Sequence, residues 1–172
     1  MRRMVLAAAL LAFVPMSASL AGVPAPRVPV RSLAALHTPL PYPYDEKAQA
    51  DAAVNAAFER AKKSGKRVLV DFGGNWCPDC RILAGVMDIP EVKSFVAAHY
   101  EVATVDVGMF NRNLTIVNRM GVPKLKGVPT VVIADAEGRF VNVTNSAELA
   151  NAREMTPQGI ADWLARWAEP VR

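Results

Sequence analysis

The chain of 172 residues is poor in the residues that build metal sites and in dense runs of one charge. It has two cysteines and two histidines, so one chain cannot supply four cysteine ligands to a metal. The net charge is +4, but the longest basic cluster, residues 62–67, has the pattern of a helix end followed by a turn. Without a dense basic run, we expect no nucleic-acid partner.

The one long apolar run lies at the N-terminus. Residues 1–21 have the pattern of a signal peptide, because Arg2 and Arg3 precede an apolar run and small residues lead up to Ala21. The run is too short to span a bilayer, and no cysteine follows Ala21 to carry a lipid. We therefore expect cleavage after Ala21 and a periplasmic or secreted protein, in a compartment that supports disulfide chemistry. An uncleaved amphipathic anchor is the alternative.

Proline is concentrated in the segment that follows. Six of the 13 prolines fall within residues 22–44, and each proline fixes φ and removes a backbone donor. The composition therefore predicts an extended, poorly packed spacer between the signal peptide and a domain at residues 45–172. A docking segment built on Tyr42 and Tyr44 is the alternative.

The spacing of apolar residues predicts the secondary structure in the rest of the chain. Helices are expected at residues 45–63, 77–87, 90–98 and 113–120 and from Thr156 onward, and strands at 67–72, 100–107, 130–133 and 139–143. A turn at residues 135–138 joins the last two strands as a hairpin. This order predicts a three-layer α/β domain with a mixed sheet and helices on both faces.

The two cysteines are the most informative residues. Cys77 and Cys80 lie between a predicted strand and a predicted helix. A metal site would need two more ligands, and His37 and His99 lie far from the pair in sequence. A purely structural disulfide would close a very small loop and remove little entropy from the unfolded chain. The remaining interpretation, a redox-active dithiol, is the one we favour.

Physical chemistry supports that interpretation. A thiolate is the attacking species in disulfide exchange, and the N–H groups and dipole of a helix N-terminus would stabilise a negative sulfur on Cys77. Cys80 lies on the next turn, within bonding reach. Cys77 can therefore form a mixed disulfide with a substrate, and Cys80 can resolve it. Pro78 would hold the first helical turn, and Trp76 would shield one side of the pair.

Residues 70–80, with the cysteine pair, and residues 126–130, with Pro129, together resemble the thioredoxin superfamily. The resemblance covers roughly residues 50–168 and implies a thioredoxin-like sandwich. It also implies that Pro129 is a cis-proline facing the dithiol, with the backbone of Val128 pairing with a bound substrate chain. An ordinary proline at the start of a strand is the alternative, and Pro123 is a similar proline with no strand after it.

The same resemblance assigns a role to Asp71. Thioredoxins carry a buried carboxylate here, which would take the proton of Cys80 as that thiol attacks; an exposed aspartate at a strand end is the alternative. The chain also departs from the family pattern. No lysine occurs in the neighbouring strand at residues 100–106, and Gly73 stands where a tryptophan is common. The segment from Asp106 to Pro129 looks long, and residues 145–154 look inserted.

Asp79, between the cysteines, bears on the direction of the reaction. A carboxylate near Cys77 opposes a second negative charge and raises the pKa of its thiol. A less stable thiolate makes a better reductant, so Asp79 favours a reductase. An oxidase or isomerase that uses the same dithiol is the first alternative. The second is a non-catalytic adaptor or a copper chaperone, for which Met87 and Met120 would be the candidate ligands.

The chain is also similar to small secreted thioredoxin-like proteins and to the soluble C-terminal domain of the transmembrane disulfide reductase. That similarity implies protein disulfide or dithiol clients and a membrane electron donor. We expect a monomer and no cofactor or metal beyond a redox-active Cys77–Cys80 disulfide. The expected catalytic residues are Cys77, Cys80 and Asp71, and the expected client-binding residues are Trp76, Pro78, Asp79, Val128 and Pro129.

Overall fold

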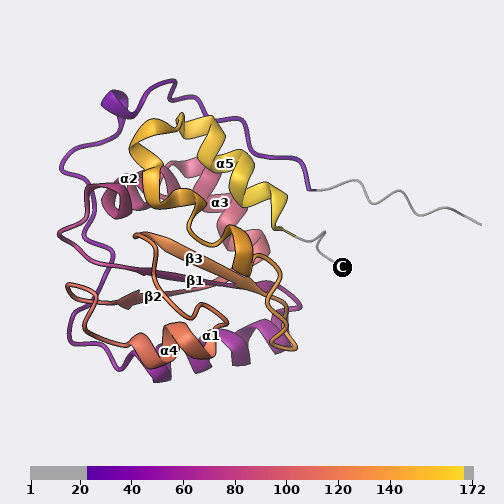
Figure 1. Cartoon of the computed structure of the whole chain (residues 1–172). Coiled ribbons are helices and arrows are strands. Elements are labelled where there is room, and N and C mark those ends of the chain that lie inside the picture. The colour runs from indigo at the N-terminus through magenta and orange to yellow at the C-terminus, as the bar shows by residue number, and fades with distance from the viewer. Residues whose placement is uncertain (1–22, 169–172) are drawn as a thin grey trace, which may run out of the picture.

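The computed structural model of the chain describes residues 23–168 as three layers, with a sheet between two layers of helices (Figure 1). The strands are β1 (Arg67–Gly73), β2 (Tyr100–Asp106) and β3 (Thr130–Ala134); the helices are α1 (Ala50–Ser64), α2 (Pro78–Met87), α3 (Pro90–His99), α4 (Leu114–Arg119) and α5 (Pro157–Arg166). Short 3₁₀ helices occupy Leu33–Ala35, Val143–Asn145 and Glu148–Glu154. The strand order is β2-β1-β3, with β1 parallel to β2 and antiparallel to β3. The predicted mixed α/β sandwich is confirmed.

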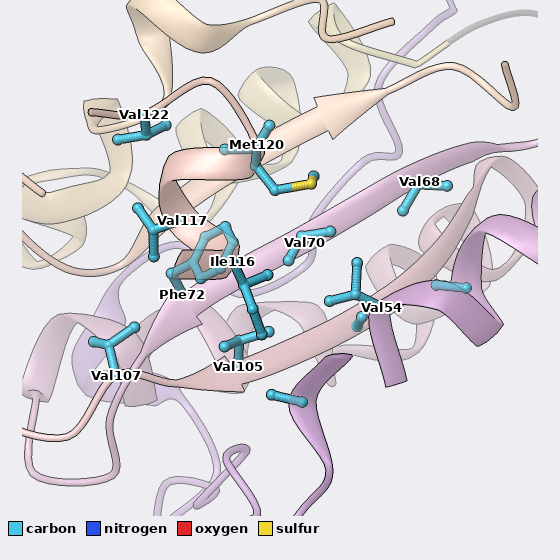
Figure 2. Close-up of a cluster of buried hydrophobic side chains, with 14 of the residues drawn as sticks. Val54, Val68, Val70, Phe72, Val105, Val107, Ile116, Val117, Met120 and Val122 are labelled. Atoms are coloured by element: carbon cyan, nitrogen blue, oxygen red, sulfur yellow. The ribbon is translucent and has the colours of Figure 1, made fainter. Parts of the chain in front are cut away.

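The central strand β1 sends alternate side chains into two separate cores. Val68, Val70 and Phe72 face α1 and α4, where they pack in the cluster of Figure 2. Leu69 faces the opposite layer, which α2, α3 and α5 build. The same alternation directs Asp71 to the α2 side of the sheet, beneath the cysteines.

The helix ends follow the local signals in the sequence. Gly65, with φ of 71°, ends α1 in the left-handed region, and the Thr156 hydroxyl caps α5 by accepting from the N–H of Gly159 at 3.0 Å. The predicted start of α1 at residue 45 is wrong. Asp45 instead forms a turn, accepting from the N–H of Lys47 at 2.9 Å, and this delays the helix to Ala50.

Residues 23–44, which we call the strap, pack along the outside of the α2, α3 and α5 layer before the chain reaches α1 (Figure 1). The expectation of a poorly packed spacer is wrong. Leu36 is buried, and the N–H of Val28 donates to Gln158 on α5 at 2.9 Å. The Arg81 side chain donates to the carbonyl of Leu40 at 2.8 Å. Apolar residues between the prolines thus reach the core, while the backbone carbonyls find donors on the domain.

The predicted strand at residues 139–143 is also wrong, although the turn before it is present. After one bridge between Ala134 and Phe140, the chain leaves the sheet. The side chain of Asn142 then bonds β3 in place of a backbone ladder. Its oxygen accepts from the N–H of Ile133 at 2.7 Å, and its amide donates to the carbonyl of Val131 at 2.8 Å. A buried side-chain amide has replaced the second half of the hairpin.

The predicted signal peptide at residues 1–21 lies outside the described residues. Within residues 23–168, no helix has both the length and the apolar character needed to cross a bilayer.

Replacing Asn142 tests its role at the edge of β3. Asn142→Ala removes two buried hydrogen bonds and leaves a donor and an acceptor of β3 without partners. We expect the free energy of unfolding to fall by about 2–4 kcal/mol, measured by urea denaturation. Asn151→Ala, at an exposed position, is the control and should change it by less than about 0.5 kcal/mol. Equal stability of the two variants would contradict this role.

Candidate active site

The two cysteines lie at the beginning of α2, and both are free thiols in the structure. Cys77 is the N-cap residue and Pro78 begins the helix, a position where the missing N–H of proline costs nothing. The sulfur of Cys77 accepts from the backbone N–H of Cys80 at 3.2 Å. On its other side, the Cys77 thiol donates to the carbonyl of Val128 at 3.3 Å. The fold therefore brings the cysteine pair against the residue before Pro129.

The pKa values of the two thiols are shifted in opposite directions. A hydrogen bond from the Cys80 thiol is the main influence that lowers the pKa of Cys77 to about 7, against the opposing effect of burial. The same hydrogen bond, together with burial, raises the pKa of the Cys80 thiol. Cys77 can thus exist as a thiolate at neutral pH while Cys80 stays protonated, which is the division of labour that disulfide exchange requires.

Asp79 is placed differently from the expectation. Its carboxylate is buried and forms an ion pair with the guanidinium of Arg153, with Nε 3.0 Å from Oδ2. The backbone N–H of Arg153 also donates to it, at 2.8 Å. Asp79 does raise the pKa of Cys77, but this effect is smaller than the hydrogen bond from Cys80, and the net pKa is lowered. Because the Asp79 side chain is buried, it does not present a surface for a client to contact, unlike the prediction that it binds clients. The Asp79 carboxylate also does not set the pKa of Cys77 by itself.

Asp71 is buried below the cysteine pair rather than exposed at a strand end. Burial raises its pKa to about 7, while a hydrogen bond from Tyr44 acts in the opposite direction. The Tyr44 hydroxyl donates to Oδ2 of Asp71 at 2.9 Å. The other carboxylate oxygen has no hydrogen-bond partner among the described residues. A carboxyl group of this kind can exchange a proton at neutral pH.

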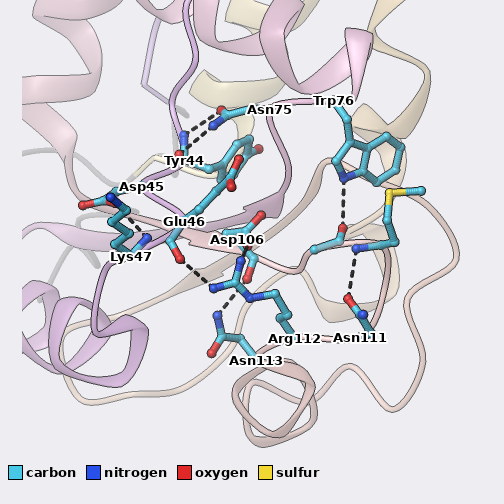
Figure 3. Close-up of polar contacts among 12 residues, drawn as sticks. Tyr44, Asp45, Glu46, Lys47, Asn75, Trp76, Asp106, Asn111, Arg112 and Asn113 are labelled. Atoms are coloured by element: carbon cyan, nitrogen blue, oxygen red, sulfur yellow. Dashed lines mark hydrogen bonds and ion pairs between the residues drawn. The ribbon is translucent and has the colours of Figure 1, made fainter.

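The surface around the cysteines is partly apolar. Trp76 is 46% exposed and is fixed by a hydrogen bond from its ring N–H to the carbonyl of Gly108 at 2.9 Å (Figure 3). Its ring packs on Phe110, with centroids 5.9 Å apart. A hollow of about 500 Å³, lined by Phe110, Leu114, Val117, Pro123, Lys124 and Leu125, continues this surface.

The peptide bond between Val128 and Pro129 is cis. Both residues are buried beside Cys77, whereas Trp76 and Pro78 are exposed. The five expected client-binding residues therefore divide by exposure. Two side chains face solvent, those of Val128 and Pro129 are buried next to the cysteine pair, and Asp79 lies inside the protein.

Sequence reasoning missed Tyr44 and Arg153. Tyr44 lies in the strap, 27 residues before its partner Asp71, and Arg153 lies 74 residues after Asp79. The absence of a lysine from β2 and the small side chain at Gly73 were the available hints that another residue serves Asp71. Nothing local marked Arg153, apart from its place in a segment that looked inserted. Within residues 23–168, no group of three or more His, Cys, Asp or Glu side chains is arranged to hold a metal ion.

Comparison with known proteins gives consistent matches. A family model described as thioredoxin-like matches residues 49–136, slightly more than half of the chain. A thioredoxin from Alicyclobacillus acidocaldarius subsp. acidocaldarius is 30% identical over 79 residues, which cover 46% of this chain and 68% of that protein. The crystal structure of a disulphide isomerase from Xylella fastidiosa Temecula1 is 41% identical, with a TM-score of 0.70. That match covers 74% of this chain and 97% of the other.

Removing the Arg153 side chain tests its effect on the thiol. Arg153→Ala leaves the charge of Asp79 uncompensated and removes a cation that favours the Cys77 thiolate. Both effects raise the pKa of Cys77. We expect the midpoint of its alkylation by iodoacetamide against pH, followed by mass spectrometry, to rise by about 0.5 to 1 unit.

Arg166→Ala is the matched control, because Arg166 forms an ion pair elsewhere, with Glu148 at 3.1 Å. Its midpoint should stay at the wild-type value. An unchanged midpoint in Arg153→Ala would show that Asp79 and Arg153 do not influence the cysteines.

Proposed function

The chain belongs to the thioredoxin-like family and is a thiol–disulfide oxidoreductase, and we propose that it reduces disulfide bonds of client proteins through Cys77 and Cys80. The observation that carries this proposal is the geometry at the start of α2, where Cys77 caps the helix and its sulfur accepts from the N–H of Cys80 at 3.2 Å. This placement lowers the pKa of the Cys77 thiol and raises that of the Cys80 thiol. The first can attack a disulfide, and the second can wait until a mixed disulfide has formed.

The reaction has two steps. The Cys77 thiolate attacks one sulfur of the client disulfide, which breaks that bond and releases the other client sulfur as a thiolate. Cys80 then passes its proton to Asp71 and attacks the sulfur of Cys77, and the second client sulfur leaves. Two electrons have moved from the dithiol to the client, and the protein is left with a Cys77–Cys80 disulfide.

The acidity of Cys77 supports the direction of the reaction. A pKa of about 7 matches the value typical of thioredoxin, whereas strongly oxidising family members stabilise the thiolate to a pKa of about 3.5. A thiolate that is only moderately stabilised leaves the disulfide form weakly oxidising. The charge of Asp79 is balanced by Arg153, so that carboxylate does not by itself set the direction of the reaction.

The compartment follows from the N-terminal sequence. The signal-peptide pattern at residues 1–21 supports export to the periplasm. A reductase in an oxidising compartment needs a continuous source of electrons. We therefore propose a membrane-bound dithiol protein as the donor that returns the Cys77–Cys80 disulfide to its reduced form, and monomeric action on client proteins.

The client chain would bind across Val128, beside the exposed ring of Trp76. An extended client segment can add to backbone groups there as a further strand. The hollow beside Phe110 would take an apolar client side chain, and Lys124 and Lys126 at its border would favour acidic neighbours.

An isomerase is the second candidate, because the 41% identical relative carries that name. Recovery of activity from scrambled ribonuclease, measured beside insulin reduction, separates the two functions. The copper-chaperone alternative is less well supported, since Met120 is buried in the core on the α1 and α4 side of the sheet (Figure 2).

Serine variants of the cysteines test the roles of the two thiols. Cys77→Ser removes the attacking sulfur, so we expect insulin reduction with dithiothreitol as donor to fall to the uncatalysed rate. Cys80→Ser cannot resolve the intermediate, and it should accumulate a mixed disulfide with insulin that non-reducing electrophoresis detects. Catalysis by Cys77→Ser, or a mixed disulfide that forms equally in both variants, would contradict these assignments.

Asp71→Asn tests the proton acceptor. The reduced protein is mixed with 5,5′-dithiobis(2-nitrobenzoic acid), which releases one coloured thiolate when Cys77 attacks and a second when Cys80 resolves the mixed disulfide. Asp71 accepts a proton in its ionised form, so the second wild-type phase should rise with pH through about 7. In Asp71→Asn we expect this phase to be at least about 100-fold slower at pH 7 and the first phase to be nearly unchanged. A second phase at the wild-type rate would exclude Asp71 as the acceptor.

A further inference from the structure

We infer that Tyr44 is a positioning residue of the active site, which the strap carries to Asp71 so that this carboxylate is held ready for the proton of Cys80. Tyr44 donates to Oδ2 of Asp71 at 2.9 Å, and both side chains are buried. In the described part of the chain this is the one hydrogen bond that the Asp71 carboxylate receives. This inference rests on the proposed function and assigns part of its machinery to a segment outside the family-model match at residues 49–136.

The structure reserves space for the tyrosine at Gly73. A Cβ at this position would lie 2.6 Å from Cζ of Tyr44 and 2.7 Å from the sulfur of Cys80. Contacts this short do not occur, so any larger residue would displace the tyrosine or the cysteine. Because residue 73 has no side chain, the Tyr44 ring and the Cys80 thiol can both occupy the space next to Gly73, close to Asp71.

The strap is fixed at Tyr44 itself and at the residue before it. Asn75, two residues before Cys77, bonds both backbone groups of Tyr44, accepting from its N–H at 3.1 Å and donating to its carbonyl at 2.8 Å (Figure 3). The hydroxyl of Thr104 on β2 donates to the carbonyl of Pro43 at 3.0 Å. The loop that begins the active-site helix and the edge strand β2 thus both determine where the tyrosine lies.

The charges around Asp71 explain what this hydrogen bond does. Burial strongly disfavours ionisation of Tyr44, so its hydroxyl remains a donor at all relevant pH values. Donation to Asp71 favours the carboxylate form, against the effects of burial and of negative charge on Cys77. Cys80 is the other titratable group next to the pair. On β2 the facing residue is Thr104, which does not titrate. Without the tyrosine hydroxyl, less of Asp71 would be ionised at neutral pH.

The strap also borders a route for the proton. A hollow of about 280 Å³ is lined by Pro41 and Pro43 of the strap, by Asp71 and Thr104, and by Asp88 after the end of α2. A proton that Asp71 has taken from Cys80 can leave through this hollow to solvent. The strap therefore supplies both the donor that orients the carboxylate and one wall of its exit.

Tyr44→Phe isolates the hydroxyl, because it keeps the ring and its burial. In the two-phase assay with 5,5′-dithiobis(2-nitrobenzoic acid), we expect the second phase to slow about 10-fold at pH 7 and its pH midpoint to rise by about one unit. The first phase should stay within about twofold of wild type. Tyr42→Phe is the matched control, since Tyr42 lies on the same strap but is 65% exposed, and it should leave both phases unchanged.

The double variant Tyr44→Phe with Asp71→Asn distinguishes positioning from a general structural role. If the tyrosine acts through Asp71, the double variant is no slower than Asp71→Asn alone, because the two effects are not additive. Wild-type rates and an unchanged midpoint in Tyr44→Phe, or full additivity in the double variant, would overturn the inference while leaving the proposed function intact. A wild-type protein that releases one thiolate and never the second would instead contradict the proposed function itself.

Discussion

The chemistry of the site depends on the contact between Cys77 and Cys80 at the start of α2, where the sulfur of Cys77 accepts from the N–H of Cys80 at 3.2 Å. This contact makes one thiol acidic and keeps the other protonated. It exists because Cys77 caps α2, so that Cys80 follows on the first turn. Only residues 74–77 separate the end of β1 from Pro78, the first residue of α2. On its other side, the Cys77 thiol donates to the carbonyl of Val128. This hydrogen bond connects the cysteine pair to a segment 51 residues later in the chain.

Buried carboxylates surround this contact, and partners from distant parts of the chain control them. Asp79 lies inside the protein because Arg153 balances its charge. Asp71 receives its hydrogen bond from Tyr44. An unpaired buried carboxylate is costly, and the two sites resolve this cost differently. Full ion pairing holds Asp79 in a structural role, while one neutral donor leaves Asp71 with a pKa near 7 and able to exchange a proton.

The sequence predicted the features that local patterns determine. The sheet strands β1, β2 and β3, the helix caps at Gly65 and Thr156, and the cysteine pair at a helix N-terminus all follow from spacing and residue type. The errors concern side chains that act over long distances. Asn142 replaced a predicted strand by bonding β3 through its amide, and the strap packed on the domain despite its prolines. Tyr44 and Arg153 reach the site only through the folded chain. Gly73 and the absence of a lysine from β2 indicated that another residue serves Asp71, but no local pattern could identify that residue as Tyr44 or reveal Arg153.

We propose that the protein acts as a reductase whose nucleophile, Cys77, is only moderately acidic. The most direct test is the reduction potential of the Cys77–Cys80 pair, measured on the purified protein in dithiothreitol and glutathione redox buffers. For a reductase we expect a value near the thioredoxin end of the scale, about −270 mV. A value near the oxidising end, about −120 mV, would contradict it and make the protein a donor of disulfide bonds.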